Sequence, residues 1–193
     1  TTEIYTLSLH DALPILLDLR NNLLPAAGLD NLKLVQLFGD TDGSFINGGG
    51  GGFSVPYDLV ANANLSDAEK DAIYGDLLPF LDFENPGYDS LANAEAIVEI
   101  SSYADGLGPW KNNILLRGAI DTPVDGNGDG VAEITSQLTG EVFPLIDFAH
   151  DAGLQIHPYT LRDEERFLTL NPDGTPQTDR KSTRLNSSHQ IIS

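Results

Sequence analysis

Three short runs of apolar residues recur along the chain, and each ends in glycine, proline or polar residues. They occupy residues 33–39 (KLVQLFG), 103–109 (YADGLGP) and 154–160 (LQIHPYT). Compact apolar runs of this length, closed by turn-forming residues, are typical of buried strands. We therefore predict three short strands, the second of which runs into a turn.

The segments between these runs carry apolar positions at helical spacing. Ser66 and Glu69 have the spacing of a capping box, which predicts that a helix begins there. Pro109 suits the first turn of a helix, and Gly153 suits a left-handed helix end. The predicted helices cover residues 16–31 (ending near Pro25 and Gly28), 66–83, 89–101, 109–117 and 139–153.

The order of these elements favours an α/β fold. Strands that alternate with helices pair in parallel through right-handed crossover connections. Three strands are too few to close a sheet on itself. A doubly wound sheet and a slice of a (β/α)8 barrel both fit the pattern.

Composition narrows the function classes. The chain of 193 residues has 29 acidic and 10 basic residues, a formal net charge of −19. Such a field repels nucleic acids and anionic membranes, so we expect no nucleic-acid partner. No apolar run approaches the roughly 20 residues of a membrane-spanning helix, so we expect no transmembrane segment. The sequence has no cysteine, which excludes disulfides, zinc–thiolate sites and cysteine nucleophiles.

The two ends differ in composition from the rest. Residues 1–15 (TTEIYTLSLHDALPI) and 180–193 (RKSTRLNSSHQIIS) resemble translated sequencing-adapter read-through of the kind found in metagenomic assemblies. Three of the ten basic residues fall in the last fourteen positions, a sharp break after Asp179. The alternative is a natural, basic and serine-rich tail. We expect the protein proper to be residues 16–179.

Three stretches carry a resemblance to a known family. They are LKLVQLFGDTDG (32–43), YADGLGPWKNNIL (103–115) and AHDAGLQIHPYTLRDE (149–164). In this order they resemble the C-terminal half of the periplasmic type of glycerophosphodiester phosphodiesterase, over most of residues 32–166. The tandem of DGLGP and HPYTLR carries most of the specificity.

That resemblance implies a partial (β/α)8 (TIM) barrel of the phospholipase-C-like type, with the three strands as about the fifth to seventh. Such enzymes hydrolyse glycerophosphodiesters to glycerol 3-phosphate and an alcohol. They use a divalent cation, Ca²⁺ or Mg²⁺, and a pair of acid–base histidines. The resemblance also implies a periplasmic or secreted parent protein. The motifs that supply the catalytic histidines and metal carboxylates are not found in residues 16–179, so we assign no catalytic residue and expect this chain alone to be inactive.

Substrate-pocket candidates are polar residues at the strand ends, where barrel enzymes bind their ligands. His157, Tyr159 and Arg162 follow the third strand, and Gln36 and Asp105 lie in the first two. Each also has an ordinary structural interpretation: a histidine bound to backbone, an arginine paired with the carboxylates of RDEERF, or an aspartate in a turn before Gly106.

One loop has the spacing of a calcium site. In DGNGDGVAE (125–133), Asp125, Asn127 and Asp129 stand at positions 1, 3 and 5 of an EF-hand-style loop, with Gly130 sixth and Glu133 ninth. Ser136 replaces the bidentate glutamate of position 12. The alternative is an acidic, glycine-rich surface turn.

Three function hypotheses remain open. The first is a truncated glycerophosphodiester phosphodiesterase. The second is a non-catalytic, calcium-stabilised acidic secreted module, and the third is another phospholipase-C-like phosphodiesterase barrel.

Overall fold

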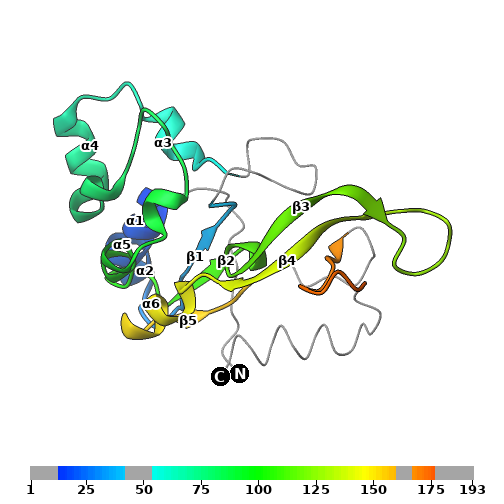
Figure 1. Ribbon diagram of the computed structural model, residues 1–193. Helices are drawn as coiled ribbons and strands as arrows, with labels where there is room; N and C mark the ends of the chain where they lie inside the picture. The colour runs from blue at the N-terminus through cyan, green and yellow to red at the C-terminus, as the bar shows by residue number, and fades with distance from the viewer. Residues whose placement is uncertain (1–12, 42–53, 160–166, 177–193) are drawn as a thin grey trace.

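The computed structural model describes residues 13–41, 54–159 and 167–176 (Figure 1). Both adapter-like ends therefore lie wholly or largely outside the described residues. The helical elements are α1 (Leu13–Asp18), a π-helical turn (Leu19–Leu23), α2 (Leu24–Ala27), α3 (Tyr57–Ala61), α4 (Asp67–Tyr74), α5 (Ala94–Ile100), α6 (Leu145–Asp151) and short 3-10 turns at Gly75–Phe80, Asp89–Leu91 and Lys111–Asn113. The strands are β1 (Val35–Phe38), β2 (Gly106–Pro109), β3 (Leu115–Val124), β4 (Ile134–Val142) and β5 (Gln155–Ile156).

The three predicted strands form one small parallel sheet. Its order is β1-β2-β5, and both pairs are parallel. Because neighbouring strands are parallel, the chain crosses back over the sheet between β1 and β2 and again between β2 and β5. The prediction of a parallel α/β sheet is confirmed. This arrangement is compatible with part of a barrel, although the described strands do not show a barrel.

One face of this sheet packs against helices. Phe38 of β1 and Leu107 of β2 are fully buried in a cluster with Ile97 and Ile100 of α5 and Leu145 of α6. In Figure 1 the helices gather on one side of the three strands. The opposite face carries Val35 and Leu37, which are only partly buried because successive side chains alternate between the faces of a strand.

Several helix ends follow the sequence. The Ser66–Glu69 capping box is present at the start of α4. Gly28 takes the left-handed conformation after α2, and Gly153 takes it just beyond α6. The helix predicted over 89–101 is shorter, because the Asn93 side chain accepts a hydrogen bond from the Ala96 amide and so starts α5 at Ala94.

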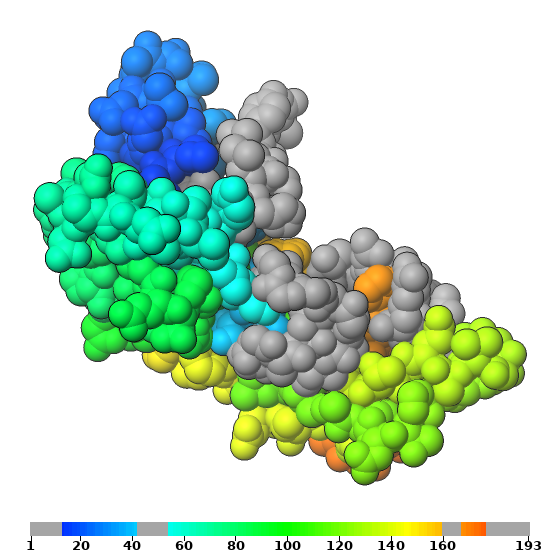
Figure 2. Space-filling view, turned by 90° about the horizontal axis from the view of Figure 1, so that it is seen from above, coloured from blue at the N-terminus to red at the C-terminus, as the bar shows by residue number. Residues whose placement is uncertain are grey.

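The helix predicted over 109–117 is wrong, and so is the start of the one predicted over 139–153. Residues 115–124 and 134–142 form an antiparallel hairpin, β3 and β4, and α6 begins only after Pro144. Figure 2 shows this hairpin projecting beyond the helical part of the molecule. A nine-residue window holds too few apolar positions to separate helical from strand periodicity.

The hairpin has a small core of its own. Ile134, Leu168 and Leu170 are buried together, with Ile120 and Val124 packed against them. Leu170 donates to the Ser136 carbonyl at 2.8 Å and accepts from the Leu138 amide at 2.9 Å. The segment 167–176 therefore supports the hairpin from one side.

Candidate functional site

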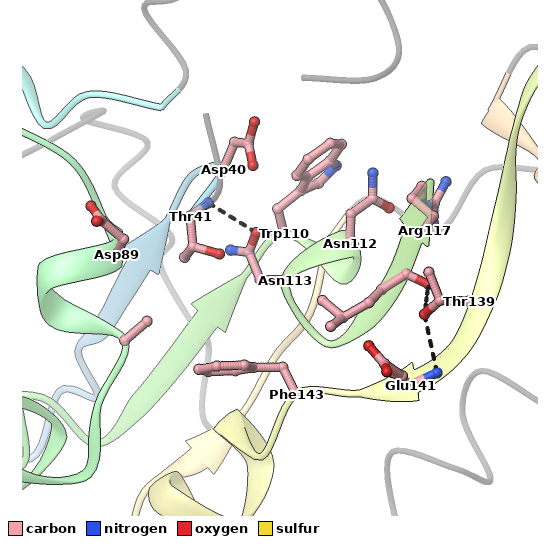
Figure 3. Close-up of a pocket in the computed structure, with 12 residues that line it drawn as sticks. Asp40, Thr41, Asp89, Trp110, Asn112, Asn113, Arg117, Thr139, Glu141 and Phe143 are labelled. Atoms are coloured by element: carbon pink, nitrogen blue, oxygen red, sulfur yellow. Dashed lines mark hydrogen bonds between the residues drawn. The ribbon is translucent and has the colours of Figure 1, made fainter. Parts of the chain in front are cut away.

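A cavity of about 440 Å³ opens at the carboxyl ends of β1 and β2 (Figure 3). Asp40 and Thr41 follow β1, Trp110 and Asn112 follow β2, and the hairpin closes the other side. The carboxyl edge of a parallel sheet is where α/β proteins bind ligands. The full lining is Asp40, Thr41, Asp89, Ala92, Trp110, Asn112, Asn113, Leu116, Arg117, Thr139, Glu141 and Phe143.

The floor of the cavity is held by backbone and amide hydrogen bonds. Asn113 donates through Nδ2 to the Gly39 carbonyl at 2.5 Å and accepts at Oδ1 from the Thr41 amide at 3.2 Å. The Trp110 amide donates to the Phe38 carbonyl at 3.0 Å. These contacts join the segments after β1 and β2 at the base of the cavity.

Two cationic side chains lie near this cavity in a poorly solvated place. Burial and, after it, the positive charge of Arg117 lower the pKa of Lys111 to about 8. Burial also lowers the pKa of Arg117 to about 10. Lys111 Nζ donates to the Phe167 carbonyl at 3.3 Å, whereas Arg117 Nε and Nη1 are buried without a hydrogen-bond partner in the described part of the chain.

Carboxylates line the same cavity. Asp40 is buried, and Ser54 Oγ donates to its Oδ2 at 3.4 Å. Asp89 and Glu141 also border the space. Among residues 13–41, 54–159 and 167–176, no three histidine or carboxylate side chains come together in a group that could hold a metal ion. The residues that line this cavity therefore do not form a site for the catalytic divalent cation that the family resemblance implies.

Gln36 lies in the helix-facing core rather than at the cavity. It is 3% exposed, and its Oε1 accepts a hydrogen bond from the Tyr103 hydroxyl at 3.2 Å. Its Nε2 donates to the Leu37 carbonyl at 3.0 Å. A buried amide with both ends partnered explains a glutamine inside an apolar strand.

Asp105 lies at the amino ends of the strands, opposite the cavity. It pairs with Arg20 and, at 2.7 Å, with Lys33, and it accepts from the Leu34 amide at 3.0 Å. Burial raises the pKa of this carboxyl, but the hydrogen bonds from Lys33, Leu34 and Arg20 outweigh burial and lower it. These contacts join α1–α2 to the sheet and fit the structural interpretation of Asp105, which does not line the cavity described above.

The candidate residues that follow β5 differ in their surroundings. His157 is exposed, and its amide donates to the Leu107 carbonyl at 2.7 Å. Tyr159 is partly buried; its hydroxyl donates to the Phe38 carbonyl at 2.7 Å, and its own carbonyl accepts from the Lys111 amide at 2.7 Å. Both belong to the carboxyl edge of the sheet, yet neither lines the cavity. Arg162 lies outside the described residues.

The 125–133 loop forms the tip of the hairpin. Asp125 accepts from the amides of Gly128 at 2.6 Å and Gly130 at 2.8 Å. Asn127 Oδ1 accepts from the Asp129 amide, and Asp129 Oδ1 accepts from the Val131 amide, both at 2.8 Å. Hydrogen bonds from the backbone amides of Gly130 and Gly128, and after them of Asn127 and Asp129, lower the pKa of Asp125. Within the described loop, Glu133 makes no hydrogen bond to these residues.

The chain is similar over part of its length to a known protein. No family model matches it. It is 28% identical over 120 residues to the glycerophosphodiester phosphodiesterase GDPD6 of Arabidopsis thaliana. The aligned part makes up 61% of this chain and 27% of that protein, so the chain spans little more than a quarter of the relative's length. This partial similarity supports the family resemblance seen in the three motifs.

Sequence reasoning missed the residues that build the cavity. Asp40 directly follows an apolar strand, a position that could have suggested a site residue. Asn112 and Arg117 fall within residues 109–117, for which the sequence predicts a helix, so the sequence does not indicate that they lie beside the cavity.

Proposed function

We propose that this chain is part of a glycerophosphodiester phosphodiesterase, a phosphoric diester hydrolase that releases glycerol 3-phosphate and an alcohol. The observation that carries the proposal is the 28% identity over 120 residues to a plant enzyme of that name. The parallel sheet with a cavity at its carboxyl edge supports it, since this edge is where a barrel phosphodiesterase would bind its substrate.

In this proposal the chain supplies part of the pocket wall. The acid–base histidines and the carboxylates for a Ca²⁺ or Mg²⁺ ion would come from other parts of the parent protein, because the described residues hold no such metal group. The parent would be periplasmic or secreted, as the motif resemblance implies. No helix in the described part of the chain is long and apolar enough to span a bilayer.

The experiment is an assay of a longer protein that contains this segment. Incubation with glycerophosphocholine should release glycerol 3-phosphate, whereas phosphatidylinositol should stay intact. Cleavage of phosphatidylinositol with no release from glycerophosphocholine would instead assign the chain to another phospholipase-C-like phosphodiesterase.

A second candidate function rests on the hairpin tip. The side-chain oxygens of Asp125, Asn127 and Asp129 are pre-arranged by successive backbone amides. We infer that this loop binds Ca²⁺ weakly and structurally, which would also suit a non-catalytic, calcium-stabilised secreted module. A longer protein that contains this segment and binds Ca²⁺, but releases no glycerol 3-phosphate from glycerophosphocholine, would favour that module.

A further inference from the structure

Two residues that line the cavity at the carboxyl edge carry buried polar atoms without partners in the described part of the chain. Asn112 is buried, and its Oδ1 receives no hydrogen bond from the described residues. Arg117 Nε and Nη1 are likewise buried without an acceptor. Figure 3 draws these two side chains toward one end of the pocket, with Asp89 at the other.

Unpartnered buried groups of this kind are costly. A buried donor or acceptor without a partner loses its hydration and gains nothing in return, and a charged group loses more than a neutral one. Native proteins satisfy nearly all such atoms, so an orphaned set that borders an open cavity indicates a ligand. Here the set combines cationic donors with a neutral acceptor.

The charges around Arg117 point to an anion. Lys111 lies near enough to Arg117 for the two positive charges to repel, and in the described part of the chain no carboxylate forms an ion pair with either. Glu141 borders the same cavity without pairing with Arg117. An anion beside Arg117 would relieve the repulsion between the cations and supply the missing acceptors.

We propose that Arg117 binds the phosphate group of a phosphorylated polyol, such as a glycerophosphate, and that Asn112 Oδ1 accepts a hydrogen bond from one of its hydroxyls. Phosphate oxygens accept the guanidinium donors, which form charge-assisted hydrogen bonds. The free amide oxygen calls for a donor on the same ligand, and a polyol hydroxyl provides one. A cavity of about 440 Å³ falls within the roughly 300–1,000 Å³ usual for small-molecule sites.

This assignment deepens the proposed function and rests on it for the choice of a glycerophosphate. It also makes a prediction about the empty protein. An unpaired buried charge destabilises the fold, so replacing Arg117 by methionine should leave the melting temperature unchanged or raise it when no anion is present. A structural arginine would show a loss instead.

The test is titration of the whole 193-residue chain with glycerol 3-phosphate, inorganic phosphate and glycerol, followed by calorimetry and by thermal melting. Glycerol 3-phosphate should bind and raise the melting temperature. R117Q should weaken that binding by about tenfold or more, since a charge-assisted contact is lost. N112L should weaken the binding of glycerol 3-phosphate but leave the affinity for inorganic phosphate unchanged.

Two controls make the result specific. Glu141→Gln removes a negative charge from the cavity and should bind the anion at least as tightly as the unaltered chain. Arg20→Gln removes an arginine at the far end of the sheet, so it should lower the melting temperature without altering anion affinity in the folded protein. Far-ultraviolet circular dichroism establishes that each variant is folded.

Equal affinity of R117Q and the unaltered chain for glycerol 3-phosphate would overturn the proposal, as would the lack of any binding by the folded chain. If N112L changes the affinities for inorganic phosphate and glycerol 3-phosphate equally, the proposed contact between Asn112 Oδ1 and a ligand hydroxyl is wrong. If a parent protein binds glycerol 3-phosphate through Arg117 but hydrolyses no glycerophosphodiester, the proposed phosphodiesterase activity is wrong and the proposed anion site stands. If it hydrolyses glycerophosphodiesters but its binding of glycerol 3-phosphate does not depend on Arg117, the anion site is wrong and the phosphodiesterase activity stands.

Discussion

The hydroxyl of Tyr159 donates a 2.7 Å hydrogen bond to the carbonyl oxygen of Phe38, 121 residues earlier in the chain. The same carbonyl accepts from the Trp110 amide at 3.0 Å. The carbonyl oxygen at the end of β1 thus accepts hydrogen bonds from both segments that follow β2 and β5. The contact fixes the carboxyl edge of the sheet, where the cavity opens.

Replacing Tyr159 by phenylalanine should therefore destabilise the fold by about 1 kcal/mol, the usual net value of one hydrogen bond. The loss should stay small because the Phe38 carbonyl keeps its bond from Trp110. Urea unfolding measures the change. Tyr57→Phe is the control. Tyr57 is 69% exposed, so loss of its hydroxyl should not change the free energy of unfolding.

The ion pairs of Asp105 should make stability depend on acid pH. Its folded pKa is lowered, because the hydrogen bonds from Lys33, Leu34 and Arg20 outweigh the effect of burial. A lowered folded pKa contributes stability above the unfolded value of about 3.9, and that stability is lost as pH falls through the folded pKa.

Asp105→Asn should thus cost about 1 kcal/mol or less near neutral pH, after allowance for solvent screening of a partly exposed pair. The difference from the unaltered chain should shrink as the pH is lowered below 4. Urea titrations across this range provide the measurement. A difference that stays constant with pH would show that Asp105 acts through something other than its charge.

Two glycines of β2 should respond differently to alanine. A Cβ at Gly106 would lie 2.9 Å from the Gln155 carbonyl oxygen, a backbone atom of β5. A Cβ at Gly108 would lie 2.5 Å from Leu37 Cδ2, the end of a flexible side chain. Gly106→Ala should cost about 1–3 kcal/mol by overpacking, and Gly108→Ala less, because Leu37 can rotate away. Equal losses in denaturant unfolding would contradict this order.

The hairpin tip should bind Ca²⁺ weakly. Calorimetry on the chain should show binding that Asp125→Ala removes and Asp129→Ala weakens, since both supply oxygens at alternating positions. Glu133→Gln should have little effect because Glu133 is outside the hydrogen-bonded loop as described. Calcium binding that persists in Asp125→Ala would place the ion elsewhere.

The sequence predicted the parallel sheet well because its strands are short, apolar and sharply ended. The capping box at Ser66 and the left-handed Gly153 were equally readable, since each depends on local chemistry. The hairpin was not readable in the same way. Residues 109–117 fit helix and strand alike, and the strand forms because Leu115 and Arg117 pair with Val142 and Leu138, more than twenty residues further along the chain.

The site was harder to predict than the fold for the same reason. Gln36 and Asp105 stand beside strand ends in the sequence, but long-range partners, Tyr103 for one and Arg20 for the other, decide which way they face. Arg117 became a candidate only once β3 was known to border the cavity. Spacing along the chain does not report such tertiary contacts.

This chain, expressed alone, should release no glycerol 3-phosphate from glycerophosphocholine. Hydrolysis of a phosphodiester needs a general acid and a general base, and their loss typically costs about 10²–10⁴-fold in rate. In the described part of the chain the histidines are His150 and His157; both are exposed, and neither lines the cavity. No carboxylate group there is arranged to hold a metal that could neutralise the phosphate. Purified chain incubated with glycerophosphocholine and Ca²⁺ should match the buffer blank, while a longer protein carrying the segment should not. Turnover by the chain itself that disappears in a His150→Ala, His157→Ala double variant would show that these two histidines form the acid–base pair after all.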